Sequence, residues 1–173
     1  MDNPAVKYGV YFGGFFVLYV TLLKFIAPKM IFTGSLTTVL GLAVPIICMV
    51  WVAREVRNQE DGYLSYGEAL KNTFLVYVIG SLIYTLYQYI LVNFIDPSLL
   101  ESQKEAVMEA GNWISKILGA NEEMVEEFQE QLEEVAEAST HQTFGTVILG
   151  WVGGLIFGFI LSAIVSAFVK KTN

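Results

Sequence analysis

The chain has 173 residues and a net charge of −7, and its composition is 54% hydrophobic but only 16% charged. This length fits one domain, and this balance is typical of an integral membrane protein rather than a soluble one. The negative charge and the lack of a basic patch argue against nucleic-acid binding.

Four apolar segments are long enough to cross a bilayer as helices, which takes about 20 residues each. The predicted fold class is therefore all-α, with one four-helix membrane domain over residues 1–173 and an insert at 96–142. The first span follows no basic cluster and precedes no small-residue cleavage site, so we expect it to remain in the mature protein. The spans are expected near residues 5–27, 31–53, 73–95 and 144–169.

The first span carries small residues four positions apart, at Ala5, Gly9 and Gly13. Residues with this spacing share one helix face and let another helix approach closely. Near the far end of the span, Lys24 could extend to the headgroups, pair with Asp96 or bind an anionic headgroup.

The second span contains Pro45, which removes a backbone hydrogen bond and predicts a kink. Cys48 lies in the same span and is the one cysteine of the chain, so we interpret it as a packing residue. After this span, Ser65 and Glu68 have the spacing of a capping box, which begins a helix. We expect that helix to run unbroken from Tyr66 into the third span.

The third span has several polar residues on one face. Polar groups at membrane depth should face protein or water rather than lipid. They could form hydrogen bonds between helices, or they could line a polar cleft shaped also by Lys24 and Pro45. The residues of this face are Tyr77, Ser81, Tyr84 and Gln88.

The insert at 96–142 is acidic, with twelve acidic residues against two lysines. Its pattern predicts two helices, and the second has a narrow apolar seam surrounded by glutamates. These glutamates could form a solvated face, or they could receive a basic partner or divalent cations. No calcium-loop spacing is present, so we predict no specific metal site. The glutamates of this candidate partner surface are Glu122, Glu123, Glu126, Glu127, Glu130, Glu133, Glu134 and Glu137.

Small residues also line one face of the fourth span, over about 24 Å at 1.5 Å per residue. Such a stripe could pair with the small residues of the first span, form a homodimer or receive a partner helix. We interpret it as half of an internal seam between the first and last spans, which makes the acidic hairpin the expected partner surface. The stripe consists of Gly150, Gly154, Gly158, Ser162 and Ser166.

Basic residues are denser on one side of the expected membrane domain. The positive-inside rule makes that side cytoplasmic, and it carries both termini. Six basic residues lie there (Lys7, Arg54, Arg57, Lys71, Lys170 and Lys171) against four on the other side (Lys24, Lys29, Lys104 and Lys116).

Three short motifs resemble a family of small bacterial membrane proteins called domain of unknown function 4199, DUF4199. They are the segment from Gly62 to Leu70, the Phe94-Ile95-Asp96-Pro97 exit from the third span, and the Gly158 to Ala163 stretch followed by Lys170-Lys171. The resemblance covers about residues 5–171 and implies a four-helix protein of a bacterial inner membrane. It implies no activity and no catalytic residues, and the glutamate-rich helix matches no family pattern.

An enzyme is the least supported class, because no cluster of His, Cys and carboxylate residues has the spacing of a metal or nucleophile site. We expect no cofactor. The leading hypothesis is a non-enzymatic accessory or scaffold subunit that contacts membrane lipids and a protein partner. The alternative is a carrier or transport auxiliary for a lipid-linked or small polar substrate.

Overall fold

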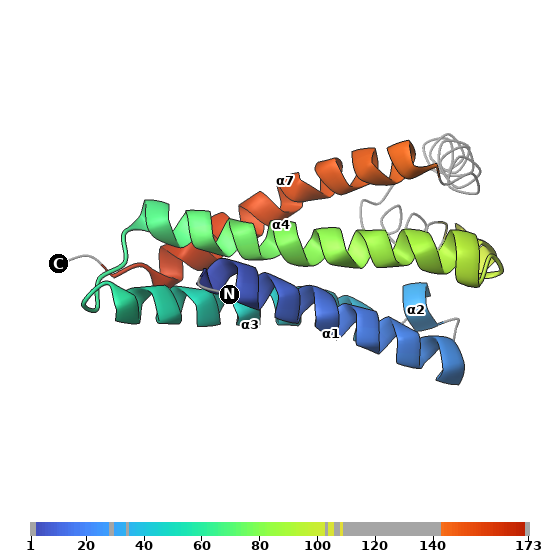
Figure 1. The fold of residues 1–173 in the computed structure, drawn as a ribbon, viewed down its shortest axis with the longest axis horizontal. Helices are drawn as coiled ribbons and strands as arrows, with labels where there is room; N and C mark the ends of the chain where they lie inside the picture. The colour runs from blue at the N-terminus through green and yellow to red at the C-terminus, as the bar shows by residue number, and fades with distance from the viewer. Residues whose placement is uncertain are drawn as a thin grey trace, which may run out of the picture.

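The computed structural model describes residues 3–27, 30–33, 35–102, 104–105, 108 and 143–171. The predicted acidic hairpin, with Glu122 to Glu137, lies outside these residues. Four of the helices are long and apolar enough to cross a membrane, which confirms the all-α, multi-pass prediction. The elements are α1 (Pro4–Ile26), α2 (Met30–Thr33), α3 (Ser35–Gln59), α4 (Tyr66–Ile90), η1 (Leu91–Ile95) and α7 (Phe144–Val169) (Figure 1).

The second span begins later and ends later than the hydropathy predicts. The short helix α2 precedes it, and α3 then continues to Gln59, past Arg54 and Glu55. Hydropathy detects only the apolar length, whereas Arg and Glu are good helix formers that extend a helix beyond it. The chain turns after α3, where Asp61 and Gly62 adopt positive φ angles of 50° and 91°.

The third span begins at the predicted capping box. The Ser65 hydroxyl accepts a hydrogen bond from the Glu68 amide at 3.3 Å, and the Glu68 carboxylate accepts one from the Ser65 amide at 3.1 Å. As expected, α4 runs unbroken from Tyr66. It ends in the π-helical turn η1, which the sequence did not predict and which is closed by an Asp96 to Leu91 backbone hydrogen bond of 2.7 Å.

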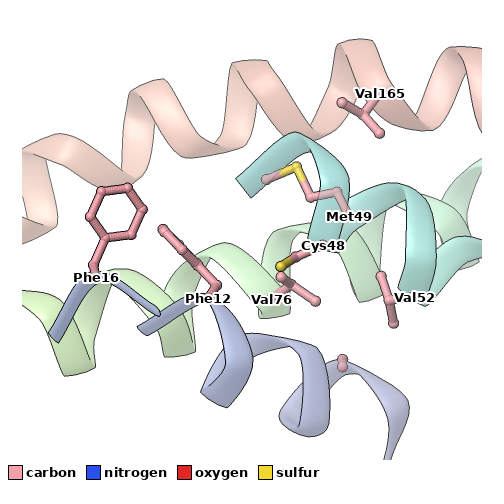
Figure 2. Close-up of a cluster of buried hydrophobic side chains, with 8 residues drawn as sticks. Phe12, Phe16, Cys48, Met49, Val52, Val76 and Val165 are labelled. Atoms are coloured by element: carbon pink, nitrogen blue, oxygen red, sulfur yellow. The ribbon is translucent and has the colours of Figure 1, made fainter. Parts of the chain in front are cut away.

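α4 is the central helix of the bundle, and α1, α3 and α7 all pack against it (Figure 1). Figure 2 shows a buried apolar cluster to which all four long helices contribute. Cys48 belongs to this cluster and is 4% exposed, as expected of a packing residue. The labelled members are Phe12, Phe16, Cys48, Met49, Val52, Val76 and Val165.

The bundle has two different ends. The termini end carries the α3–α4 link, and there Leu64 and Lys171 exchange two backbone hydrogen bonds of 2.9 Å. The insert end carries Asp96 and Thr143, where residues 97–142 attach. In Figure 1 the half of α7 nearest the insert end diverges from α1 and α3. The ends therefore differ in how closely α7 is held.

Candidate functional site

The small residues of α1 receive side chains of α4. A Cβ atom added at Gly9 would lie 2.7 Å from Cβ of Ile79, and one at Gly13 would lie 2.6 Å from Cβ of Ile83. Ala5 is fully buried on the same stripe. The stripe therefore packs inside the bundle.

The predicted seam between the first and last spans is wrong. α1 and α7 both pack along α4, and they do not pack along each other. The reason is shape: branched side chains of α4 fill the grooves that the glycines of α1 leave, so the two stripes never meet. Both stripes therefore contact α4, and they do not contact each other.

The stripe of α7 is packed in its half near the termini end. A Cβ at Gly158 would overlap the ring of Tyr77 on α4. Ser162 and Ser166 are fully buried, and the Ser166 and Thr73 hydroxyls share a hydrogen bond of 3.0 Å. This half of the stripe therefore holds α7 against the bundle.

The other half of the same stripe is uncovered. A Cβ added at Gly150, Gly153 or Gly154 would meet no described atom within 4 Å. We call these three residues the open glycine face. Gly153 was not among the predicted residues, although its position three residues after Gly150 places it beside the stripe. Leu149 and Ile156 flank the face and are 73% and 68% exposed.

The polar face of α4 forms mainly interhelical and local contacts. The indole N–H of Trp151 donates a hydrogen bond of 3.0 Å to the Ser81 hydroxyl. The Gln88 amide nitrogen donates one of 2.6 Å to the Tyr84 hydroxyl. The Gln88 amide oxygen is buried and has no hydrogen-bond partner among the described residues.

Lys24 and Pro45, expected as further cleft residues, have other surroundings. The ammonium of Lys24 lies 3.7 Å from the Asp96 carboxylate, which is one of the alternatives for this lysine. Pro45 is buried inside α3, which continues past it to Gln59. In the described residues, no hydrogen bond or ion pair connects either residue to the α4 polar face.

Asp96 also contacts Ser98, at the start of the insert. The Ser98 hydroxyl donates a hydrogen bond to the carboxylate, and this bond, with a smaller contribution from Lys24, lowers the pKa of Asp96. The charged form of Asp96 is therefore favoured, and it links α1 to the chain that leaves α4.

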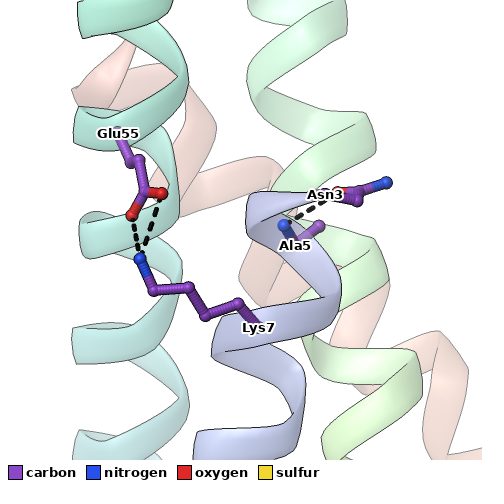
Figure 3. A network of polar contacts seen from close by, with 4 residues as sticks. All are labelled: Asn3, Ala5, Lys7 and Glu55. Atoms are coloured by element: carbon purple, nitrogen blue, oxygen red, sulfur yellow. Dashed lines mark hydrogen bonds and ion pairs between the residues drawn. The ribbon is translucent and has the colours of Figure 1, made fainter. Parts of the chain in front are cut away.

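The sequence alone did not reveal an ion pair at the termini end. The Lys7 ammonium on α1 lies 2.8 and 3.1 Å from the two carboxylate oxygens of Glu55 on α3 (Figure 3). The two residues are 48 positions apart, so no local pattern connects them. Their distance from each other in sequence explains why the prediction missed this pair.

The contacts between α1 and its neighbours near the insert end are also polar. Tyr19 shares a hydrogen bond of 3.0 Å with Thr37, and Thr21 shares one with Tyr87. The two hydrogen bonds hold α1 against α3 and α4.

Among the described residues, no three of His, Cys, Asp and Glu lie close enough together to hold a metal ion.

A family model described as protein of unknown function (DUF4199) matches residues 7–171. The match confirms the resemblance drawn from the Gly62 to Leu70 segment and the two later motifs. No curated protein and no solved structure matches the chain.

Proposed function

The chain belongs to the DUF4199 family of unknown function, and we propose that it is a non-enzymatic accessory or scaffold subunit of a membrane assembly. Its contact inside the bilayer is the open glycine face of α7. The observation that carries this proposal is that Gly150, Gly153 and Gly154 have no described neighbour within 4 Å, although the same stripe is tightly packed at Gly158.

The physical cost of these glycines supports an interface. A glycine inside a helix is less favourable than alanine by about 1 kcal/mol, and lipid alone gains nothing from the missing side chain. A second helix does gain, because its backbone can approach closely and make dispersion contacts. A helix of another subunit would pack on the open glycine face, which α1, α3 and α4 leave uncovered.

The charged and reactive residues support a role without catalysis. Cys48 is buried among apolar side chains, and the described ion pairs of Lys7 with Glu55 and Lys24 with Asp96 lie near opposite ends of the bundle. No charged pair in the described residues occupies the middle of the spans, where a membrane enzyme or proton relay usually needs one.

The proposed location is a bacterial inner membrane, with both termini cytoplasmic and residues 96–142 periplasmic. The support is the excess of basic residues at the termini end. The twelve acidic residues of the insert would then face a basic protein partner outside the membrane. This second contact is independent of the open glycine face.

A carrier role has less support. The buried amide oxygen of Gln88 is the one observation in its favour. Against it, Ser81 is bound by Trp151, and Lys24 is paired with Asp96. The polar face therefore serves mostly as contact between helices.

Two leucine substitutions separate association from folding. Gly154→Leu adds a side chain where the described structure is empty, so the protein should fold but lose its partner in mild detergent. Gly14→Leu is the matched control, because Gly14 also has no described neighbour within 4 Å but lies on α1. The wild type and Gly14→Leu should run as a complex by size exclusion with light scattering, and Gly154→Leu as a monomer. A monomeric wild type, or a Gly154→Leu variant that stays associated, contradicts the proposal.

A further inference from the structure

A charged pair at the termini end is surrounded by aromatic rings. The Lys7 ammonium lies 4.9 Å from the centre of the Tyr8 ring. That ring lies 5.8 Å from the ring of Tyr11 and 6.1 Å from the ring of Trp51. We call Lys7, Tyr8, Tyr11, Trp51 and Glu55 the Lys7–Glu55 cluster.

The cluster is open to its surroundings. The side chains of Lys7 and Glu55 are 35% and 30% exposed. Tyr11 and Trp51, measured as whole residues, are 55% and 49% exposed. Figure 3 shows the pair spanning from α1 to α3. The cluster thus belongs to the outer surface of the bundle rather than to its core.

Both charged groups keep unused hydrogen-bonding capacity. An ammonium has three donors, and Lys7 directs two contacts to Glu55. Each carboxylate oxygen has two acceptor sites, and each receives one contact from Lys7. A positive and a negative group therefore stand side by side, about 3 Å apart. The Tyr8 hydroxyl also interacts with the carboxylate, and beyond these contacts one ammonium donor and part of the carboxylate's acceptor capacity have no partner among the described residues.

The cluster lies near the ends of two helices that are long and apolar enough to cross a membrane, where headgroups are expected. Lys7 is in the first turn of α1, and Glu55 lies near the end of α3, about 6 Å from Gln59 along the helix. Tyr and Trp side chains concentrate at this level of a bilayer. The molecules that such a surface meets are phospholipids.

We propose that the Lys7–Glu55 cluster binds the headgroup of a phospholipid that carries both a phosphate and a primary ammonium group, such as phosphatidylethanolamine. Lys7 donates to the phosphate, and Glu55 accepts from the ammonium, so the two dipoles lie antiparallel. The exposed rings of Tyr11 and Trp51 attract the ammonium through their faces, while the Tyr8 ring is next to Lys7.

The charge pattern excludes other headgroups by simple chemistry. An anionic headgroup without a cation meets the Glu55 carboxylate and is repelled. A choline headgroup contacts the rings but has no N–H to donate to Glu55. The preference for a primary ammonium therefore depends on Glu55. The proposed lipid site goes beyond the proposed function, because α1 and α3 form this site and α7 forms the open glycine face.

Native mass spectrometry of the full chain in mild detergent tests the proposal. The probes are phosphatidylethanolamine, phosphatidylcholine and phosphatidylglycerol with identical acyl chains. We expect phosphatidylethanolamine to bind about tenfold more tightly than the other two, as a charge-assisted hydrogen bond allows. Glu55→Gln should abolish this preference over phosphatidylcholine.

Two further variants separate recognition from folding. Trp51→Leu keeps the ion pair and should weaken phosphatidylethanolamine binding about threefold, the size of an exposed cation–π contact. Lys24→Gln removes the lysine of the ion pair at the other end and should leave the preference unchanged. Equal binding of the three lipids by the wild type would overturn the proposal. So would a preference for phosphatidylethanolamine over phosphatidylcholine that is unchanged in Glu55→Gln.

Discussion

The two ends of the bundle use small residues in opposite ways. At the termini end, Ser162 and Ser166 of α7 are fully buried against α4 and α3. At the insert end, Gly150 and Gly154 of the same stripe have no described neighbour within 4 Å. A small residue permits close approach but does not itself attract, so the stripe becomes an interface only where a neighbour fills it. One continuous sequence pattern therefore contains a folding contact and an unused surface.

The ends also differ in how α4 holds α7. At the termini end the hydroxyls of Thr73 and Ser166 meet inside a close helix contact. At the insert end the long side chain of Trp151 reaches Ser81, and the rings of Tyr89 and Phe144 meet at 5.7 Å. Long side chains bridge a wider separation, so α7 stays attached while its small residues remain uncovered. Four substitutions or conditions test this difference, in order of expected effect.

Gly158→Leu should have the largest effect on stability. The added side chain would overlap the Tyr77 ring, and forcing extra atoms into a packed contact costs about 3 kcal/mol. Gly154→Leu is the matched substitution at the insert end and should change the unfolding free energy by less than about 0.5 kcal/mol. Thermal unfolding followed by circular dichroism in mild detergent measures both. Equal destabilisation by the two variants would contradict the division of the stripe.

Thr73→Val should have a smaller effect. It leaves the Ser166 hydroxyl without its interhelical partner, which costs about 1 kcal/mol inside a membrane bundle. Combining it with Ser166→Ala should cost less than the two single changes added together, because both remove the same bond. The unfolding free energies of the two single variants and the double variant give this coupling directly. Strict additivity would show that the bond does not stabilise the termini end.

Trp151→Phe should cost about 0.6 kcal/mol, the average for a hydrogen bond between membrane helices. The substitution keeps an aromatic ring and removes the N–H that Ser81 accepts. Because this bond holds the insert end of α7, hydrogen exchange should rise from Thr146 to Gly154 and stay unchanged near Val165. Faster exchange at Val165 alone would contradict the claim that this bond holds the insert end of α7.

The smallest expected effect on stability is that of the Asp96 charge, and it depends on pH. The folded pKa of Asp96 lies below the ordinary aspartate value of 3.8, so the charged form stabilises the fold above about pH 4, and this contribution disappears as the pH falls through the lower folded pKa. Lowering the pH from 5 to 3 should therefore destabilise the wild type more than Asp96→Asn. The fall in unfolding temperature from pH 5 to pH 3, compared between the two proteins, measures this contribution. An equal response of both proteins would show that Asp96 does not contribute.

The fold class and several local features could be predicted from the sequence because their causes are local. Apolar length predicts a span wherever backbone groups must bond internally, and Ser65 and Glu68 predict the start of α4 from a spacing of three. The hydropathy missed the end of α3, since Arg54 and Glu55 are polar yet helical. Local patterns therefore locate helices better than they locate the residues at which helices end.

The pairing of helices could not be predicted in the same way. Gly9 and Gly13 suggested a small-residue partner, but the grooves receive Ile79 and Ile83, whose complementarity appears only in three dimensions. The Lys7–Glu55 pair likewise depends on two residues 48 positions apart. The stripe of α7 predicted contact along its whole length, and only the three-dimensional structure separates its covered part from its open part.

The most direct test of the open glycine face is crosslinking in native membranes. Gly154→Cys places a thiol on that face, and Gly14→Cys is the control at an open position on α1. With a short membrane-permeant thiol- and amine-reactive crosslinker, Gly154→Cys should give one defined larger species, whose second component mass spectrometry identifies. Gly14→Cys should give none. Absence of that species, or equal crosslinking at both positions, would contradict the proposal that α7 carries the partner surface.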